Sequence, residues 1–269
     1  MNVFELEPYI PRSSPVHRLD ARVKLAVVAL YTVVLTSLPL DVHASWPLAF
    51  WALILIAIWA ARLPLGVMLR RSTIALPFAL AALALVFTTP GQPLLSTAWG
   101  PFSLTATTEG LARFFSILLK SWLGLQAALI LSATTPFTQL LCGLRSLGLP
   151  PLLVSMLGFM YRYLFVLVDE VSRMMAARDA RSARPDGRIG GTLIWRAKVT
   201  GQMAGTLFLR SYERSERIYL AMRARGFDGE IRSTQQPRLQ RHDALFAGTS
   251  LLILAVVVLS YSVLSPRVF

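Results

Sequence analysis

Residues 150–168 read PPLLVSMLGFMYRYLFVLV, and the placement of this run decides the topology of the chain. The run is long and apolar enough to cross a bilayer as a helix. If it crossed, residues 169–242, with fifteen Arg and Lys residues, would lie outside the cell, against the positive-inside rule. Arg162 would also sit in hydrocarbon. We therefore expect a helix on the cytoplasmic side, covered by other protein or lying at the membrane interface.

The composition of the whole chain indicates a membrane protein. Of its 269 residues, 55% are hydrophobic and only 15% are charged, which is too apolar for an ordinary soluble domain. The net charge of +13 is concentrated between Arg145 and Arg241. This clustering suits a cytoplasmic face beside anionic lipid or an acidic protein partner. The basic region carries no nucleic-acid-binding signature, so nucleic acid is not expected as a partner.

Five further apolar runs are candidates for membrane spans, because crossing about 30 Å of hydrocarbon takes about 20 helical residues. They are Val23–Leu40, Trp46–Ala61, Ser72–Thr88, Leu111–Ala133 and Ala244–Leu264. The first and third links between them lack Lys and Arg, whereas the second carries Arg62, Arg70 and Arg71. This alternation predicts a multi-pass protein of the inner (plasma) membrane with a cytoplasmic N-terminus.

The predicted fold is an all-α integral membrane protein with about five transmembrane helices and a cytoplasmic helical domain. We expect a membrane domain over residues 1–133, a cytoplasmic domain over 134–242 and a C-terminal transmembrane helix over 243–269. The cytoplasmic domain should contain a short helix, Pro136–Leu147, and two long helices, Pro151–Ala183 and Thr192–Arg225. Gly or Pro residues follow each of these helices closely and act as stop signals.

Arg113 and Lys120 interrupt the fourth apolar run, and their spacing of seven places them on one helix face. Charges inside a membrane span are costly and commonly mark a functional site. Alternatively, Arg113 reaches the outer interface and Lys120 pairs with a neighbouring helix. The sequence leaves both interpretations open.

The sequence offers little for catalysis or for binding a metal or cofactor in this chain. It has no Gly-rich phosphate loop followed by Lys and Ser or Thr, so we do not expect it to hydrolyse ATP itself. His17, His43 and His242 are scattered, and Asp41 with His43 makes too small a ligand set for a metal. Cys142 is the only cysteine, which excludes an intrachain disulfide. We therefore expect a non-catalytic protein without a metal or cofactor of its own.

Charged residues on the second long helix follow the spacing of helix-surface ion pairs. Glu213 stands three residues from Arg210 and four from Arg217, and Arg214 and Glu216 lie between Glu213 and Arg217. Such exposed pairs contribute only about 0.2–0.5 kcal/mol each. General acid–base work by these carboxylates is the less favoured interpretation.

Both long helices end in a tripeptide of the form Ala-Arg-small, which we call the first box (Ala180, Arg181, Ser182) and the second box (Ala224, Arg225, Gly226). Capping accounts for part of the pattern, because Arg complements the negative end of the helix dipole and Gly permits a left-handed cap. The repetition and the small neighbours also suit docking, since Arg binds carboxylates with two parallel hydrogen bonds and small residues allow a close approach. Both interpretations remain open from the residues alone.

The chain resembles the transmembrane T component of energy-coupling factor (ECF) transporters, particularly its cobalt-type branch, CbiQ. The resemblance rests on AARDARS (residues 176–182) and YERSERIYLAMRARGFDG (212–229), with SPVHRLDARVKL (14–25) and LRSLGLPPLL (144–153) followed by YRY. It implies that each box docks on one of two ATP-hydrolysing subunits, which bind ATP and Mg. It also implies that apolar helix faces carry a substrate-binding membrane subunit. Ser182 stands where the family usually has glycine.

The resemblance assigns roles to further residues on the two long helices. Arginines near the helix ends should support docking: Arg178, Arg184, Arg217 and Arg223. Apolar candidates for the contact with the substrate-binding subunit are Met156, Met160, Tyr163, Leu167, Met203 and Leu207. The implied cargo is cobalt ion, with nickel or a vitamin as alternatives. A rival of another class is an integral-membrane enzyme that acts on phosphorylated, lipid-linked substrates.

Overall fold

The computed structural model describes residues 9–38, 46–73, 76–90, 92–99, 102–182, 192–229 and 240–264. These residues form two compact units. The membrane unit contains residues 9–143 and 240–264, and the long-helix unit contains residues 144–229, each with the gaps just given. Where the functional domains begin and end remains a prediction.

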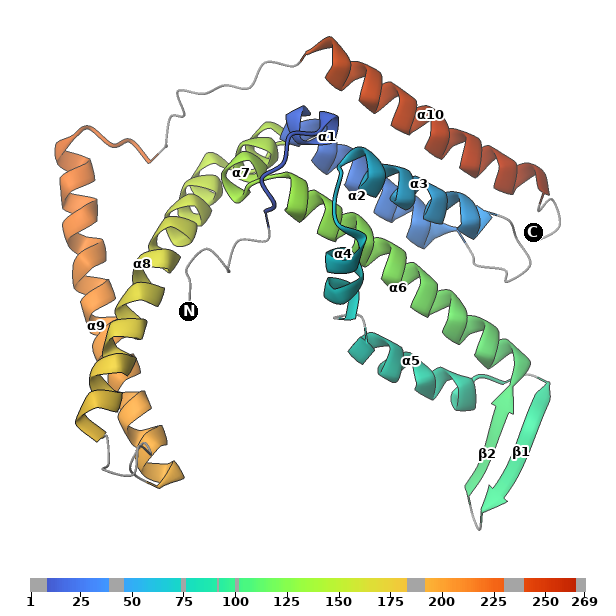
Figure 1. Ribbon diagram of the computed structural model, residues 1–269, viewed down its shortest axis with the longest axis horizontal. Helices are drawn as coiled ribbons and strands as arrows, with labels where there is room; N and C mark the ends of the chain where they lie inside the picture. Colours follow the sequence, from blue (N-terminus) through green and yellow to red (C-terminus); the bar gives the residue numbers. More distant parts are fainter. Residues whose placement is uncertain are drawn as a thin grey trace. The chain divides into compact units, whose positions relative to one another are not determined.

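Helices make up most of the membrane unit, and most of them pack against the long helix α6 (Figure 1). The helices are α1 (Pro15–Arg18), α2 (Ala21–Ser37), α3 (Trp46–Ala60), α4 (Leu65–Ser72), α5 (Leu76–Thr88), α6 (Thr108–Thr134), α7 (Phe137–Ser146), which continues into the long-helix unit, and α10 (Arg241–Leu264). Apart from one β-hairpin before α6, the prediction of an all-α membrane protein is confirmed. The run predicted from Ser72 begins later, since α4 ends there and α5 starts at Leu76, next to Pro77, a residue tolerated only in a first helical turn.

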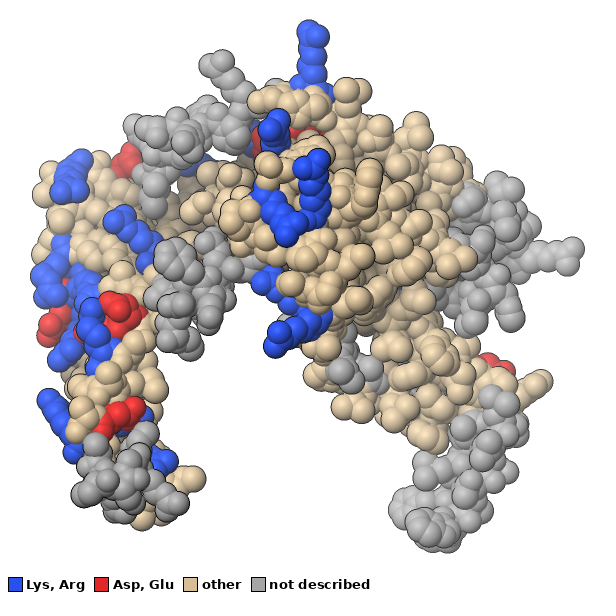
Figure 2. Space-filling model, in the orientation of Figure 1, with Lys and Arg blue, Asp and Glu red and all other residues tan. Residues whose placement is uncertain are grey.

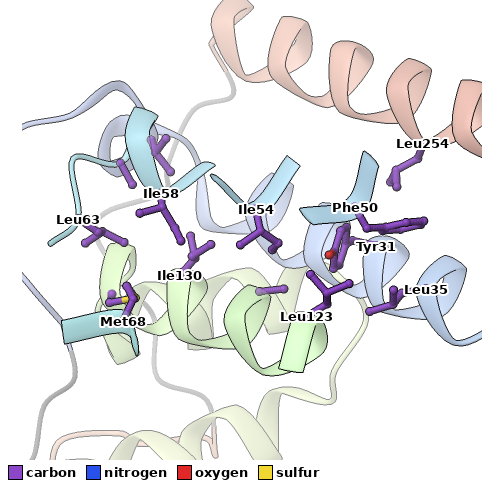
Figure 3. Close-up of a cluster of buried hydrophobic side chains, with 14 of the residues drawn as sticks. Tyr31, Leu35, Phe50, Ile54, Ile58, Leu63, Met68, Leu123, Ile130 and Leu254 are labelled. Atoms are coloured by element: carbon purple, nitrogen blue, oxygen red, sulfur yellow. The ribbon is translucent and has the colours of Figure 1, made fainter. Parts of the chain in front are cut away.

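The core of the membrane unit lies among α2, α3, α6 and α10 (Figure 3). Phe50 of α3 and Leu123 of α6 are fully buried, and the ring of Tyr31 packs edge-on against Phe50 at 5.3 Å between centroids. Lipid tails are as apolar as these side chains, so close packing rather than the hydrophobic effect favours helix association within a bilayer. This core therefore fixes α2 against the other membrane helices.

A β-hairpin precedes α6, and the sequence analysis did not predict it. Strand β1 (Pro93–Trp99) pairs antiparallel with β2 (Phe102–Thr107), with Trp99 opposite Phe102 (Figure 1). The hairpin occupies the third link, which was treated only as an uncharged loop. Its alternation of Ser and Thr with Leu, Ala and aromatic residues suits a strand.

Two long antiparallel helices of 32 residues each form most of the long-helix unit: α8 (Pro151–Ser182) and α9 (Leu193–Ala224). They run side by side, and charged side chains of both signs are interspersed over their visible face (Figures 1 and 2). The two long helices were predicted with nearly these boundaries. The hydroxyl of Thr192 caps α9 by accepting a hydrogen bond from the Trp195 amide.

Three of the described helices, α6, α8 and α10, are long and apolar enough to cross a membrane, and α3 is a shorter apolar helix. Length and composition thus leave the placement of α8 undecided. Its assignment to the cytoplasmic side still rests on the distribution of charge.

Lys120 meets a neighbouring helix, as one of the two interpretations anticipated. Its ammonium donates a hydrogen bond to the carbonyl of Thr36, in the last turn of α2, at 3.1 Å. A cation at this position complements the negative end of the α2 dipole. Arg113 is exposed, and its role stays open.

Candidate functional site

A complete glycine cap ends α9 at the second box. Gly226 has φ +80°, a left-handed conformation that glycine adopts without a Cβ clash. The Gly226 amide donates to the carbonyl of Arg223 at 3.0 Å, and the Phe227 amide donates to the carbonyl of Met222 at 3.1 Å. These two bonds constitute a Schellman motif, so the chain direction at Arg225 is fixed by the backbone.

The residue after the second box ties the end of α9 to α8. The ring of Phe227 packs edge-on against Phe159 of α8, with centroids 6.4 Å apart. Both rings line a mostly apolar cavity of about 300 Å³ between the two helices, and Met222 and Tyr163 also contribute to its wall. The second box is therefore held in place by tertiary packing as well as by its cap.

Replacing Gly226 with alanine should destabilise the end of α9 by about 1 kcal/mol, because an L side chain is strained at positive φ. Thermal unfolding of the purified chain in detergent measures the change. Gly205→Ala is the matched control in the interior of the same helix, where an added Cβ meets no atom within 4 Å. It should change stability in the opposite direction, by about 0.5–1 kcal/mol. A stabilising Gly226→Ala would contradict the cap.

The first box ends α8 differently. Ser182 is its last helical residue, and its hydroxyl donates to the carbonyl of Arg178 at 2.8 Å. Arg178 itself is engaged, since its guanidinium contacts Asp179 at 2.8 Å and lies 3.5 Å from the hydroxyl of Thr200 on α9. Serine, at the position of the usual glycine, is therefore itself part of α8. Arg184 lies outside the described residues.

The central arginine of each box is exposed. Neither Arg181 nor Arg225 makes a side-chain hydrogen bond or ion pair within the described part of the chain. Their neighbours are occupied: Arg217 faces Glu213 at 4.0 Å, and the guanidinium of Arg223 lies 5.9 Å from the centre of the Tyr219 ring. Each long helix thus presents one unpaired guanidinium at its end, flanked by an exposed alanine.

A buried carboxylate joins the middles of the two helices. Glu170 of α8, with only 8% of its surface exposed, accepts hydrogen bonds from Arg214 at 2.7 Å and Arg210 at 3.2 Å, both on α9. We call this contact the Glu170 clamp. The sequence analysis assigned both arginines to ion pairs within α9, of which the structure has only the Arg217–Glu213 pair.

A signal for the Glu170 clamp exists in the sequence, though it is coarse. In two antiparallel helices joined by a short link, residues equally far from the middle of the link face each other. The link between α8 and α9 has its middle at about residue 188, so this rule places Glu170 opposite a residue at about 205. That position is within two helical turns of Arg210. Pairing by spacing within one helix overlooked this partner.

The two boxes lie at opposite ends of the antiparallel pair. Arg181 follows Glu170 by 11 residues and Arg225 follows Arg214 by 11, in opposite directions from the clamp. At about 1.5 Å per residue, each arginine is about 16 Å along its helix from the clamp. The two arginines are therefore about 33 Å apart along the helix pair.

The apolar residues predicted to contact a substrate-binding subunit do not share one surface. Met156 and Met160 are 58% and 59% exposed, respectively. Tyr163 and Leu167 instead line the cavity beside Phe227. Leu207 is half-buried, and Met203 lines a separate groove of about 710 Å³ beside the first box.

An exposed apolar stripe on α8 extends the pair formed by Met156 and Met160. Leu152 and Leu164 continue it at four-residue spacing, which keeps all four side chains on neighbouring turns of one face. Helix α9 also exposes large apolar side chains that were not among the predicted contact residues: Phe208, Leu209, Tyr212, Tyr219 and Leu220. Among the residues the structure describes, no three His, Cys, Asp or Glu side chains gather into a metal-binding group.

Comparison with known proteins assigns the family. Residues 12–237 match the family described as cobalt transport protein, CbiQ. The energy-coupling factor transporter transmembrane protein EcfT of Heliobacterium modesticaldum is 31% identical, over 86% of this chain and 87% of that protein. EcfT of Acidaminococcus fermentans is 30% identical over 94% of both chains, and the cobalt transport protein CbiQ of Rhodobacter capsulatus is 29% identical over 57% of this chain and 61% of its own. The resemblance seen in the sequence is confirmed, and the chain belongs to the CbiQ family of cobalt transport proteins.

Proposed function

We propose that this chain is the T subunit of an ATP-driven ECF importer, a membrane scaffold and coupler whose cargo is cobalt ion. The observation that carries the proposal is the exposed arginine at the end of each long helix, which has no side-chain partner among the described residues while its neighbours are occupied. The names of the relatives support a T subunit, and the family description supports cobalt. The chain itself is non-catalytic.

Each box would dock on a separate ATPase subunit, since the boxes lie at opposite ends of α8 and α9. ATP and Mg would be bound by those subunits. A movement of the two ATPases would shift both helix ends, and the Glu170 clamp would make the helices respond together. A buried, hydrogen-bonded charge suits this role, because breaking it leaves a desolvated group unpaired.

The exposed stripe of α8 would contact the substrate-binding membrane subunit. Met156 and Met160 lie at its centre, and flexible Met side chains suit an apolar surface that adapts to its partner. In the proposed orientation the N-terminus and the long-helix unit are on the cytoplasmic side of the inner membrane. The density of Arg and Lys along residues 169–242 supports that side.

Co-purification and uptake test the proposal. The tagged chain, expressed with its ATPase and substrate-binding subunits, should retain the ATPases through purification in detergent. Proteoliposomes that hold the complex should accumulate radiolabelled Co²⁺ only with ATP on the side of the ATPases. Unlabelled nickel ion and vitamins are added as competitors, and one that suppresses Co²⁺ uptake is then tested as an alternative cargo. Turnover of a lipid-linked phosphate substrate by this chain alone, without retained ATPases, would contradict the proposal.

A further inference from the structure

Among the residues that the structure describes, the chain leaves the membrane unit once and returns to it once, and both passages are fixed to the same short segment. The first passage runs through α7, and the second returns to the membrane unit before α10. The segment is residues 20–25, the start of α2, which we call the α2 collar. Within residues 9–264 as described, a force that travels along the chain from the long-helix unit enters the membrane unit through one of these passages.

The first passage packs directly on the α2 collar. Gly143 of α7 is buried, and a Cβ on it would lie 2.8 Å from Leu25 Cδ1. The same Cβ would lie 3.4 Å from backbone atoms of Ala21 and Arg22. Such an approach of two helix backbones is possible because glycine has no side chain, so α7 and α2 are in close contact here.

The residues just before α7 are also bound by the α2 collar. Lys24, which is 4% exposed, donates to the carbonyl of Thr134 at 3.1 Å and to the hydroxyl of Thr135 at 3.2 Å. Thr134 is the last residue of α6, so the ammonium occupies the carbonyl end of that helix. A buried ammonium is tolerated only with such partners.

The second passage is fixed by one carboxylate. Asp243 is 2% exposed and uses both oxygens. One accepts from the amide of Gln240 at the start of α10, at 2.8 Å, and the other accepts from the amide of Asp20 at 3.0 Å. Asp20 in turn caps α2 through the Arg22 amide. A single side chain thus joins the first turns of α10 and α2.

We propose that the α2 collar is the joint through which movement of the long-helix unit reaches the membrane helices, with Asp243 and Lys24 as positioning residues. This inference rests on the proposed function. From the collar, α2 continues into the core, where Tyr31 and Leu35 pack among α3 and α6. Displacement at either passage is therefore delivered to one helix that already contacts the rest of the membrane unit.

The test compares transport with ATP hydrolysis in the complete complex in proteoliposomes. Asp243→Asn keeps the shape of the side chain and loses one of two acceptors, and Lys24→Met removes the donors. Each should lower radiolabelled Co²⁺ taken up per ATP hydrolysed by about fivefold or more, while hydrolysis stays within about twofold of wild type. Thr107→Val is the matched control, since buried Thr107 also caps a helix, through Gly110, and bonds a second segment at Thr89. It should leave the ratio unchanged.

Three results would overturn the joint. The first is a parallel fall of uptake and hydrolysis in the Asp243 and Lys24 variants. The second is an equal fall of the uptake-to-hydrolysis ratio in Thr107→Val. The third is a failure of both positioning variants to assemble into a complex, which would mean that the contacts serve only the fold. A wild-type complex that retains its ATPases but takes up no Co²⁺ would count against the cargo instead, and the ratio would then be measured with Ni²⁺.

Discussion

Replacing Arg181 and Arg225 together by glutamate is expected to abolish ATPase association and cargo uptake while leaving membrane insertion intact. Both guanidinium groups are exposed and unpaired within the described residues, so the substitution breaks no side-chain contact among them. In the complex each reversal would place like charges together, which costs several kcal/mol. Association should weaken by about a hundredfold or more. Co-purification measures it directly, and uptake in proteoliposomes follows.

The control for this prediction carries the same change of charge on the same helices. Arg173→Glu with Lys198→Glu alters two exposed residues outside the tripeptides themselves; Arg173 lines the groove beside the first box, eight residues before Arg181. Arg173 is already paired with Asp169, one turn earlier, at 2.6 Å. This variant should keep most of its affinity for the ATPases. Equal loss in both variants would indicate a general charge effect, and unchanged uptake in the box variant would refute docking.

Glu170→Gln is expected to loosen α8 from α9 and to lower uptake about tenfold, because Arg210 and Arg214 lose their shared carboxylate. The melting temperature of the purified chain should fall by about 5 °C. Asp169→Asn is the matched control at the preceding position, where the carboxylate is exposed and pairs only within α8. It should have little effect on either measurement.

A charge exchange separates the Glu170 clamp from a simple loss of charge. Glu170→Arg alone should be more harmful than Glu170→Gln, and adding Arg214→Glu should restore part of the stability. No recovery in the double variant would show that the pair itself contributes nothing. Thermal unfolding of the four proteins completes the cycle.

The pH dependence of the clamp follows from the same contacts. In the proposed orientation Glu170 lies outside the membrane, and hydrogen bonds from Arg214 and then Arg210 hold the pKa of its carboxyl below the ordinary value of 4.5. Because the pKa of Glu170 is lowered in the folded state, its ion pairs stabilise the fold fully at pH values above the ordinary pKa. That stabilisation is lost as the pH falls through the pKa of the folded state. In wild type, pairing of α8 with α9 should therefore persist to below about pH 4.5.

Features set by local chemistry could be predicted from the sequence. Gly226 stops α9 and the Thr192 hydroxyl starts it, so the long helices and their boxes were found where the structure places them. The Glu170 clamp was missed because its partners are 40 and 44 residues away in the chain. Nothing in the spacing of Arg210 and Arg214 shows whether they pair within α9 or across to α8.

Contacts between distant elements account for the other omissions. The β-hairpin depends on pairing between two segments with weak individual strand signals, and the uncharged composition suggested only a loop. The bond between Asp243 and Asp20 joins residues 223 positions apart. Asp243 therefore looked like an ordinary polar residue at the start of the last apolar run.

Each box arginine is separated from a residue of the Glu170 clamp by the same number of residues, 11, on its own helix. Eleven helical residues turn the chain by about 1,100°, which is only about 20° more than three full rotations. Each box arginine consequently lies almost directly along the axis from its clamp residue: Arg181 from Glu170 and Arg225 from Arg214. A single inserted residue would rotate a box by about 100°, so the length of these segments fixes the direction in which the guanidinium groups leave the helices.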